Sequence, residues 1–344
     1  MSRRSLTLVI ATLATVAAIA VTVLVPVPYV ILTPGPTLNT LSKDSSGKPL
    51  ISITGRVTYP TTGNLNMVTV SFQGGPGKVL NVYKALRAWL NPSEAVVPED
   101  ELFPPGQTAQ QTQAQDTEQM ASSQEMAAAA ALTELHIGYQ TQVEVNSTVA
   151  GYPASKVLKA GDIIEEVDGK PVTGETSLSS MITGHPVGST LQLVVLRSGK
   201  TLTVPVTSKL SGGTPVIGVQ VQQQYKFPFN VRISVGNIGG PSAGMMFALG
   251  IIDKLTPLDL TGGKFIAGTG EITASGQVQP IGGIQQKMVG ARDAGATVFL
   301  APAGNCSDTA GAVPAGLKVV KVSTLSQAVS DLEAIKAGKS VPSC

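Results

Sequence analysis

The sequence reads Gly239-Gly240-Pro241-Ser242-Ala243-Gly244 and then continues as an uncharged apolar run over residues 245–252. The small residues on either side of Ser242 leave its hydroxyl clear, and glycine permits backbone conformations that a Cβ would forbid. The apolar run predicts a helix, whose first turn presents unpaired N–H groups and a dipole that favours negative charge. A serine nucleophile with a site for an oxyanion needs this combination.

A serine nucleophile also needs a base, and the chain offers few. It contains only two histidines, His136 and His185, each in a sequence context unlike that of Ser242. About 45 residues after the serine, the run 276–287 turns at a Gly-Gly pair into a predicted helix that carries Lys287 in its first turns. Lysine can act as a base where desolvation lowers its pKa towards neutrality. The alternative is that Ser242 only caps a helix and Lys287 lies in solvent.

Five short motifs in this half of the chain resemble the proteolytic domain of Lon proteases, in the order and near the spacing of that family. They are Gly240-Pro241-Ser242-Ala243-Gly244, Thr269-Gly270-Glu271-Ile272, the run 276–287, Ala294-Gly295 and Ala301-Pro302. The resemblance implies that Ser242 and Lys287 form a Ser–Lys dyad that cleaves peptide bonds, with Thr269 beside it. Many members carry an acidic residue three positions before the serine. This chain has Gly239 there, so the resemblance does not define the polar network around the dyad.

The N-terminal region predicts a membrane anchor. Arg3 and Arg4 precede twenty uncharged residues, 6–25, and the next charged residue is Lys43. Twenty residues in a helix span about 30 Å, the thickness of the hydrocarbon core. The two arginines favour a cytoplasmic N-terminus, which places the remainder outside the cytoplasm at the cell membrane. We therefore predict a cytoplasmic stub at 1–5 and an uncleaved anchor at 6–28, rather than a cleaved signal peptide.

Residues 29–125 are predicted to hold the N-terminal part of the proteolytic domain and most of a connector helix. Strand-like alternation occurs at 51–55 and 64–72, and the second of these resembles the opening strand of the Lon proteolytic domain. Residues 107–134 are rich in Gln, Ala and Met without Gly or Pro, which predicts a long helix. The chain contains no Gly-x4-Gly-Lys-Ser/Thr motif, so proteolysis driven by its own ATP hydrolysis is not expected.

Residues 126–212 are predicted to form an inserted PDZ-like domain. The segment 162–172, with its Asp168-Gly169 turn, resembles the signature of PDZ domains. Such domains bind a peptide end as an added strand and hold its carboxylate on backbone N–H groups. We expect that carboxylate loop at residues 136–139, although its sequence departs from the usual form. The alternative is a spacer domain without peptide binding.

Residues 213–344 are predicted to complete the catalytic part, ending in a strand at 319–322 and a helix at 325–337. The only two cysteines, Cys306 and Cys344, predict one disulfide if the domain is exported. No ligand spacing for a metal is present, and we expect neither a metal nor a cofactor.

The sequence thus predicts an α+β protein: a Lon-type proteolytic domain with an inserted PDZ-like, β-rich domain, preceded by one transmembrane helix. Charged residues make up 13% of the chain and the net charge is +2, so nothing indicates a nucleic-acid partner. The organisation resembles anchored Lon-like proteins with PDZ domains from Gram-positive bacteria, including actinobacteria. That resemblance implies an ATP-independent serine endopeptidase acting on extracytoplasmic proteins or peptides, and self-association, since the family's domains often form rings of six.

Two alternatives remain at this stage. One is a membrane-tethered PDZ module that binds peptides while its Lon-like part is an inactive scaffold. The other is a Ser–Lys enzyme of the signal-peptidase kind, which shares the chemistry but not the ordered motifs.

Overall fold

The computed structural model describes residues 3–43 and 46–344. Residues 1 and 2 of the predicted cytoplasmic stub lie outside this description. The chain divides into two compact units, one comprising residues up to 137 together with 229–344, and the other residues 138–228. The second unit is therefore an insertion within the sequence of the first, as predicted for the PDZ-like domain.

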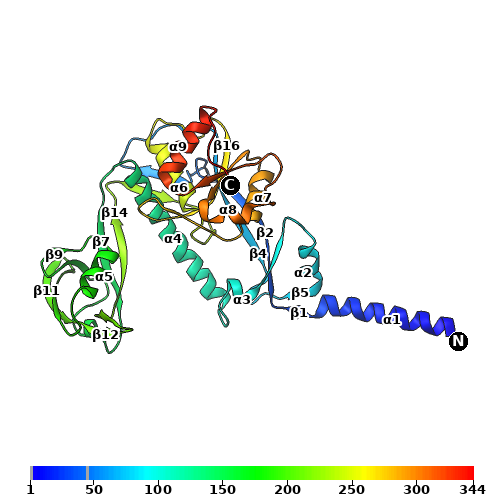
Figure 1. Ribbon diagram of the computed structural model, residues 1–344, viewed down its shortest axis with the longest axis horizontal. Coiled ribbons are helices and arrows are strands. Elements are labelled where there is room, and N and C mark those ends of the chain that lie inside the picture. The colour runs from blue at the N-terminus through cyan, green and yellow to red at the C-terminus, as the bar shows by residue number, and fades with distance from the viewer. Residues whose placement is uncertain (1–2, 44–45) are drawn as a thin grey trace. The chain divides into compact units, whose positions relative to one another are not determined.

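The chain begins with α1 (Arg3–Leu24), which extends away from the rest of its unit (Figure 1). Of this helix, Arg4–Leu24 is long and apolar enough to cross a membrane, with a mean hydropathy of 2.4. The helix ends four residues before the predicted limit of 28 because Pro26 and Pro28 cannot continue it. The segment that follows is extended, as predicted: β1 (Pro26–Val27) pairs with β5 (Leu80–Asn81), and β2 (Tyr29–Asn39) enters the main sheet.

A six-stranded sheet forms the centre of this unit in the described part of the chain. Its order is β20-β19-β16-β4-β2-β6, with parallel pairing from β20 to β4 and antiparallel pairing at the β2 and β6 edge. All five residues of β19 are buried, so both faces of the sheet are covered here. The strands besides β2 are β4 (Asn64–Gln73), β6 (Ala95–Pro98), β16 (Phe265–Gly268), β19 (Val298–Pro302) and β20 (Lys318–Val322).

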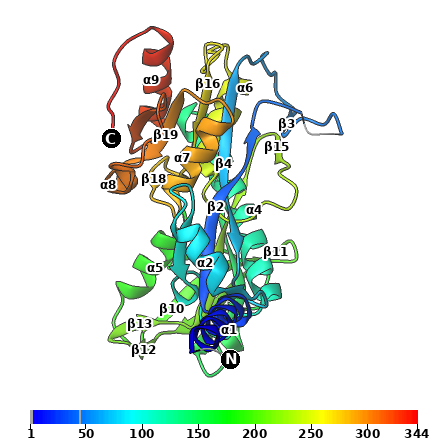
Figure 2. The ribbon, with the colours of Figure 1, turned by 90° about the vertical axis from the view of Figure 1, so that its right-hand side faces the viewer.

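Helices cover this sheet. Helix α7 (Ile284–Asp293) packs against the two long strands β2 and β4 (Figure 2). The apolar helix α6 (Gly244–Leu255) packs against α4 (Ala109–Glu134), β4 and α9 (Leu325–Lys336). The remaining elements of the unit are α2 (Val82–Trp89), α3 (Glu99–Leu102), η2 (Ala303–Asn305), α8 (Cys306–Thr309), and the strand pairs β3 (Ile51–Thr54) with β15 (Asn230–Ile233) and β17 (Glu271–Ile272) with β18 (Val278–Gln279).

The inserted unit is a small antiparallel sheet with one main helix. The sheet order is β11-β10-β8-β7-β14, with β9 paired to β8, which leaves β14 at one edge. Its apolar core is made by both sheet residues and helix α5 (Glu175–Thr183). The other elements are β7 (Gln140–Thr148), η1 (Pro153–Lys156), β8 (Ile163–Val167), β9 (Lys170–Pro171), β10 (Thr190–Arg197), β11 (Lys200–Thr207), β12 (Lys209–Ser211), β13 (Thr214–Val216) and β14 (Val219–Lys226).

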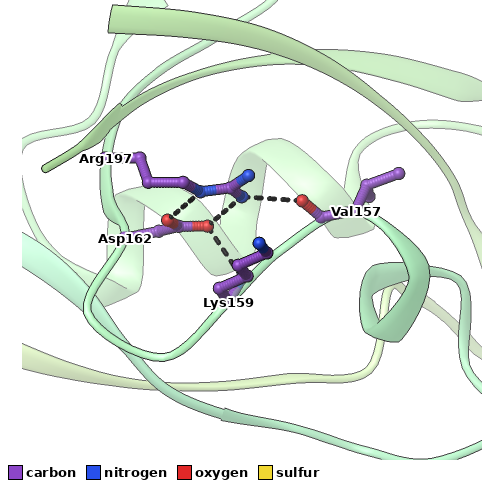
Figure 3. Close-up of polar contacts among 4 residues, drawn as sticks. All are labelled: Val157, Lys159, Asp162 and Arg197. Carbon is purple, nitrogen blue, oxygen red and sulfur yellow. Dashed lines mark hydrogen bonds and ion pairs between the residues drawn. The ribbon is translucent and has the colours of Figure 1, made fainter. Parts of the chain in front are cut away.

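An ion pair between buried Asp162 and partly buried Arg197 connects the turn before β8 to the end of β10 (Figure 3). The carboxylate of Asp162 accepts hydrogen bonds from Nε and Nη2 of Arg197, both at 2.6 Å, and from the amide of Lys159 at 2.8 Å. Arg197 Nη2 also donates to the carbonyl of Val157 at 2.7 Å. Burial alone raises the pKa of Asp162, but the hydrogen bonds and charge of Arg197 outweigh it, so that pKa lies below its usual value.

The compact unit 138–228 differs from the 126–212 proposed from sequence at both ends. Residues 126–134 continue α4, and its alanines 127–131 are all buried within the first unit. At the other end, β14 completes the inserted sheet by pairing with β7 over eight residues, so the unit extends past 212.

Candidate active site

Ser242 lies directly before α6, in a turn made possible by its glycines. Gly240 has φ of +84°, a conformation that side-chain-bearing residues rarely adopt. Gly244 packs so closely that an added Cβ would lie 2.8 Å from Cγ2 of Ile272. The carbonyl of Ser242 accepts a hydrogen bond from the amide of Gly270 at 2.8 Å, which ties the turn to the segment after β16.

Lys287 lies in the first turns of α7, where the sequence predicted it. The helix starts after Gly283, whose φ is +69° and where an added Cβ would lie 2.7 Å from Cγ2 of Val70. Only 3% of Lys287 is exposed. Its Nζ donates a hydrogen bond to Oγ of Ser242 at 2.9 Å.

Thr269 joins the two. It is fully buried at the end of β16, and Nζ of Lys287 donates to its Oγ1 at 3.2 Å. The same hydroxyl donates to the carbonyl of Ser242 at 2.9 Å. A hydroxyl that donates its only hydrogen to a carbonyl presents its lone pairs to the amine, so Thr269 fixes where Nζ points.

The electrostatic environment of Lys287 is dominated by burial. Burial lowers the pKa of its amine from 10.5 to about 7, because a charged ammonium loses its hydration there. The described residues provide no ion-pair partner for it. A large fraction of the amine is therefore uncharged near neutral pH, the form that can accept a proton.

Helix α4 supports the serine turn, a role that the sequence did not indicate. The carbonyl of Asp116 accepts a hydrogen bond from the amide of Gly240 at 3.0 Å, and Oγ of Ser123 donates to the carbonyl of Pro241 at 2.9 Å. A Cβ at Gly239 would lie 2.5 Å from Cβ of Asp116. This contact leaves no room for a side chain at position 239, because α4 fills the space with Asp116.

A cleft of about 450 Å³ gives access to Ser242 and Lys287. Most of its lining is apolar or backbone, and Asp116 is the acidic side chain that faces it, half-buried with a pKa raised by burial. The described residues offer this carboxylate no ion pair or hydrogen bond. The apolar lining includes Leu32, Met67, Val70, Phe72, Leu102 and Met120.

A second layer holds the loop before Lys287. The side-chain amide of buried Asn305 donates to the carbonyl of Ile281 and accepts from its amide, both at 2.9 Å. The next residue, Cys306, forms a disulfide with Cys344, the pair expected from sequence. In the segments 3–43 and 46–344, no group of three or more His, Cys, Asp or Glu side chains lies close enough to hold a metal ion.

The inserted unit has a groove of its own, between α5 and the strands at its edge. It measures about 500 Å³ and is lined by α5 residues such as Leu178 and Ile182 on one side and by residues 215–219 and Val221 on the other. The expectation that residues 136–139 form the carboxylate loop is wrong, since none of them lines this groove. The segment Val216-Ile217-Gly218-Val219, which leads into the edge strand β14, lines the groove instead.

Comparison with protein-family models agrees with this architecture. Residues 219–334, about a third of the chain, match the Lon protease (S16) C-terminal proteolytic domain. Residues 113–207 match the PDZ domain. The chain therefore carries a Lon-type proteolytic domain and a PDZ domain. The first match begins at β14, although that strand pairs within the inserted sheet.

Curated relatives match over short segments. Lon protease 1 of Bacillus subtilis is 34% identical over 97 residues, 28% of this chain and 12% of that protein. Lon protease of Dictyoglomus thermophilum is 35% identical over 152 residues, 44% of this chain and 18% of that protein. The chain thus spans less than a fifth of these relatives. Among solved structures, the PDZ domain of an SdrC-like protein from Listeria monocytogenes is 30% identical, covering 23% of this chain and 85% of that one, with a TM-score of 0.22.

Proposed function

We propose that the protein is a membrane-anchored serine endopeptidase that cleaves extracytoplasmic proteins without ATP. Ser242 is the nucleophile, Lys287 the general base and acid, and Thr269 the residue that orients the lysine. The observation that carries this proposal is a buried amine, uncharged in large part near neutral pH, within 2.9 Å of a serine hydroxyl. A structural lysine would be expected either in solvent or beside a carboxylate.

The reaction follows acyl-transfer chemistry. Uncharged Nζ of Lys287 takes the proton of Ser242 Oγ as Oγ attacks the scissile carbonyl carbon. The tetrahedral intermediate collapses as the ammonium returns that proton to the leaving amine and the C–N bond breaks, leaving an ester on Ser242. The same amine then deprotonates a water molecule, whose oxygen attacks the ester; the second intermediate releases the carboxylic acid and restores the serine.

The oxyanion is proposed to bind at the start of α6. In the residues that the structure describes, the amides of Ser242 and Ala243 donate no hydrogen bond within the chain, and both residues line the cleft. These N–H groups lie at the positive end of the helix dipole. Preorganised donors of this kind typically contribute about 10²- to 10³-fold each to the rate.

The test is cleavage of a fluorescently labelled unfolded protein by the full chain in detergent, with and without ATP. We expect equal cleavage under both conditions and loss of cleavage, by at least about 10³-fold, in Ser242→Ala. Ser275→Ala, a substitution in an exposed loop hydroxyl, is the matched control and should cleave normally. A serine-directed phosphonate should label the parent protein at Ser242 alone. Undiminished cleavage by Ser242→Ala would refute the proposal, and an unlabelled, inactive parent protein would favour the scaffold alternative.

The groove of the PDZ domain supports a second activity, capture of peptide C-termini. Strand β14 is an edge strand with one side of its backbone unpaired, and α5 lies against it, so an extended peptide could add to the sheet there. The segment 216–219 would supply backbone N–H groups for the terminal carboxylate.

Steric change at Gly218 tests this capture. Its φ is +78°, and an added Cβ would lie 2.1 Å from Cβ of Tyr152, so Gly218→Ala must distort the end of the groove. We expect this variant to lose binding to a library of free-carboxylate peptides, while Gly199→Ala, a positive-φ glycine in the hairpin turn with no atom within 4 Å of an added Cβ, keeps it. Equal retention by both variants would contradict capture at this groove.

A further inference from the structure

Helix α2 has its apolar side chains on the side opposite to that expected of a soluble protein. Its inward face consists of small residues: Ala88 is fully buried and Ala85 partly buried in a small core with Ile31 and Leu80. The large apolar side chains point outwards. Tyr83 is 57% exposed, Leu86 50%, Trp89 74% and Leu90 75%.

These exposed residues form one face. Positions 83, 86 and 90 follow the i, i+3, i+7 spacing of a helical stripe, and Trp89 adjoins it. Amphipathic helices of soluble proteins normally turn such a stripe towards the core. Contiguous exposed apolar surface of this kind marks an interaction site.

The position of α2 identifies what lies against that face. The N-cap of α2, Asn81, donates from Nδ2 to the carbonyl of Val23, in the last turn of the candidate membrane span. Strand β1, which follows the span directly, pairs with Leu80 and Asn81. Figure 1 shows α2 beside the end of α1 accordingly. Since eight helical residues measure only about 12 Å, all of α2 lies close to the level at which the span ends.

The chemistry of the face matches that level of a bilayer. Tryptophan and tyrosine are enriched at membrane–water interfaces, where an apolar ring and a polar tip are both accommodated. Lys84 and Arg87 flank the apolar stripe and are exposed, Arg87 contacting Glu94 at 3.6 Å. Basic residues beside a membrane-facing stripe attract anionic headgroups.

We propose that α2 is an interfacial helix, inserted by its face Tyr83, Leu86, Trp89 and Leu90 into the headgroup region of the membrane that holds α1. This proposal rests on the proposed membrane anchor. Continuity with the span favours lipid over a second copy of the chain as the occupant, because any partner at this level would have to displace lipid already present. The contact would hold the proteolytic domain at a fixed height and tilt against the membrane surface.

Trp89 is the only tryptophan in the chain, so its fluorescence reports this helix alone. The experiment uses the full chain in vesicles of phosphatidylcholine and phosphatidylglycerol, with lipids brominated near the headgroup end of their acyl chains. We expect brominated lipid to quench most of the emission and aqueous iodide to quench little of it. In Leu86→Glu/Leu90→Glu this preference should reverse, with peptide cleavage unchanged. The control Val57→Glu, at a residue 74% exposed on another segment, should behave like the parent protein.

Other outcomes overturn the proposal in distinguishable ways. Emission quenched by iodide, in a chain that resists extraction with alkaline carbonate, excludes the lipid contact and leaves the anchor standing. Emission protected from both quenchers indicates cover by protein, such as a second copy, and also excludes it. A chain that carbonate removes from the vesicles contradicts the anchor together with the interfacial helix, whereas the proposed peptidase chemistry is judged by cleavage in detergent.

Discussion

Asp162 in the inserted unit and Lys287 in the first unit are both buried charged side chains, and their surroundings differ. Asp162 in the PDZ domain is matched by the guanidinium of Arg197 and a backbone amide, and its pKa falls. Lys287 in the proteolytic domain contacts two hydroxyls and no carboxylate, and burial lowers its pKa to about 7.

The difference separates structural from chemical use of a buried charge. A carboxylate paired with a bidentate guanidinium stays ionised and fixes two chain segments. An amine without an opposite charge changes its protonation state near neutral pH, which suits proton transfer. Substitutions at the two positions should therefore change different properties of the protein.

The largest effect is expected from Lys287→Met, which keeps the length of the side chain and removes the amine. Peptide cleavage should fall by at least about 10³-fold. Thermal stability should rise at the same time. Folding of the parent chain disfavours the protonated form of Lys287, and methionine carries no such proton. The shift from 10.5 to about 7 sets an upper limit on the order of 5 kcal/mol for this gain. Lys254→Met, at a lysine outside the cleft whose pKa burial also lowers, is the activity control.

The pH dependence of cleavage should follow the lysine. Only the uncharged amine accepts the serine proton, so kcat/KM should rise about tenfold per pH unit well below 7 and level off above it, about fiftyfold between pH 5 and 7. Measurement with a short peptide substrate from pH 5 to 9 checks this. Asp116→Asn should keep the same midpoint, and a midpoint that moves with Asp116 would assign the titration to that carboxylate instead.

Thr269→Val tests whether the lysine must be oriented as well as buried. The isosteric change removes one hydrogen bond to the amine, and such bonds contribute about 1.5–3 kcal/mol when a charged group is involved. Cleavage should drop about tenfold to a hundredfold, chiefly in kcat. Thr269→Ser should restore most of it. Equal loss in both variants would show that the hydroxyl alone is not sufficient and that packing of the methyl group is also required.

Asp162→Asn should leave cleavage of small peptides unchanged and lower the melting temperature of the PDZ domain by at least several degrees, since Arg197 loses its partner. The folded-state pKa of Asp162 is lowered, so its contribution is present above the unfolded value near 3.8 and is lost as pH falls through the folded value. Calorimetry should therefore find the difference from the parent protein largest at pH 7 and smaller as the pH falls below the unfolded value. A constant difference would point to packing rather than charge.

The position of Ser242 and Lys287 could be predicted because short local patterns encode both. A Pro-Ser-Ala-Gly turn before an apolar run and a Gly-Gly turn before a helix each place one of these residues at the start of a helix. The 2.9 Å contact between Lys287 Nζ and Ser242 Oγ depends on the tertiary structure, and only the resemblance to a family suggested it. Asp116 could not be found in this way, because nothing in the Gln- and Ala-rich helix indicates which of its residues faces the serine turn.

The groove of the PDZ domain illustrates the same limit. Residues 136–139 precede β7, the first strand of the inserted unit, and a carboxylate loop was expected there. The strand beside α5 is β14, the last of that unit, so the loop that lines the groove precedes the last strand instead. Which strand borders a helix depends on sheet order, and alternation along one segment does not reveal it.

The disulfide between Cys306 and Cys344 has a consequence for how Lys287 is supported. The residues before Cys344 pair with β20. Asn305, the residue before Cys306, forms hydrogen bonds with Ile281 in the loop that precedes α7. The disulfide therefore fixes the C-terminal tail next to the residue that holds the loop before Lys287. Closing a loop of this length contributes about 4 kcal/mol in the chain-entropy model. Under the proposed function, oxidation of this pair would complete the support of Lys287, and a chain in a reducing compartment would hold that lysine less firmly.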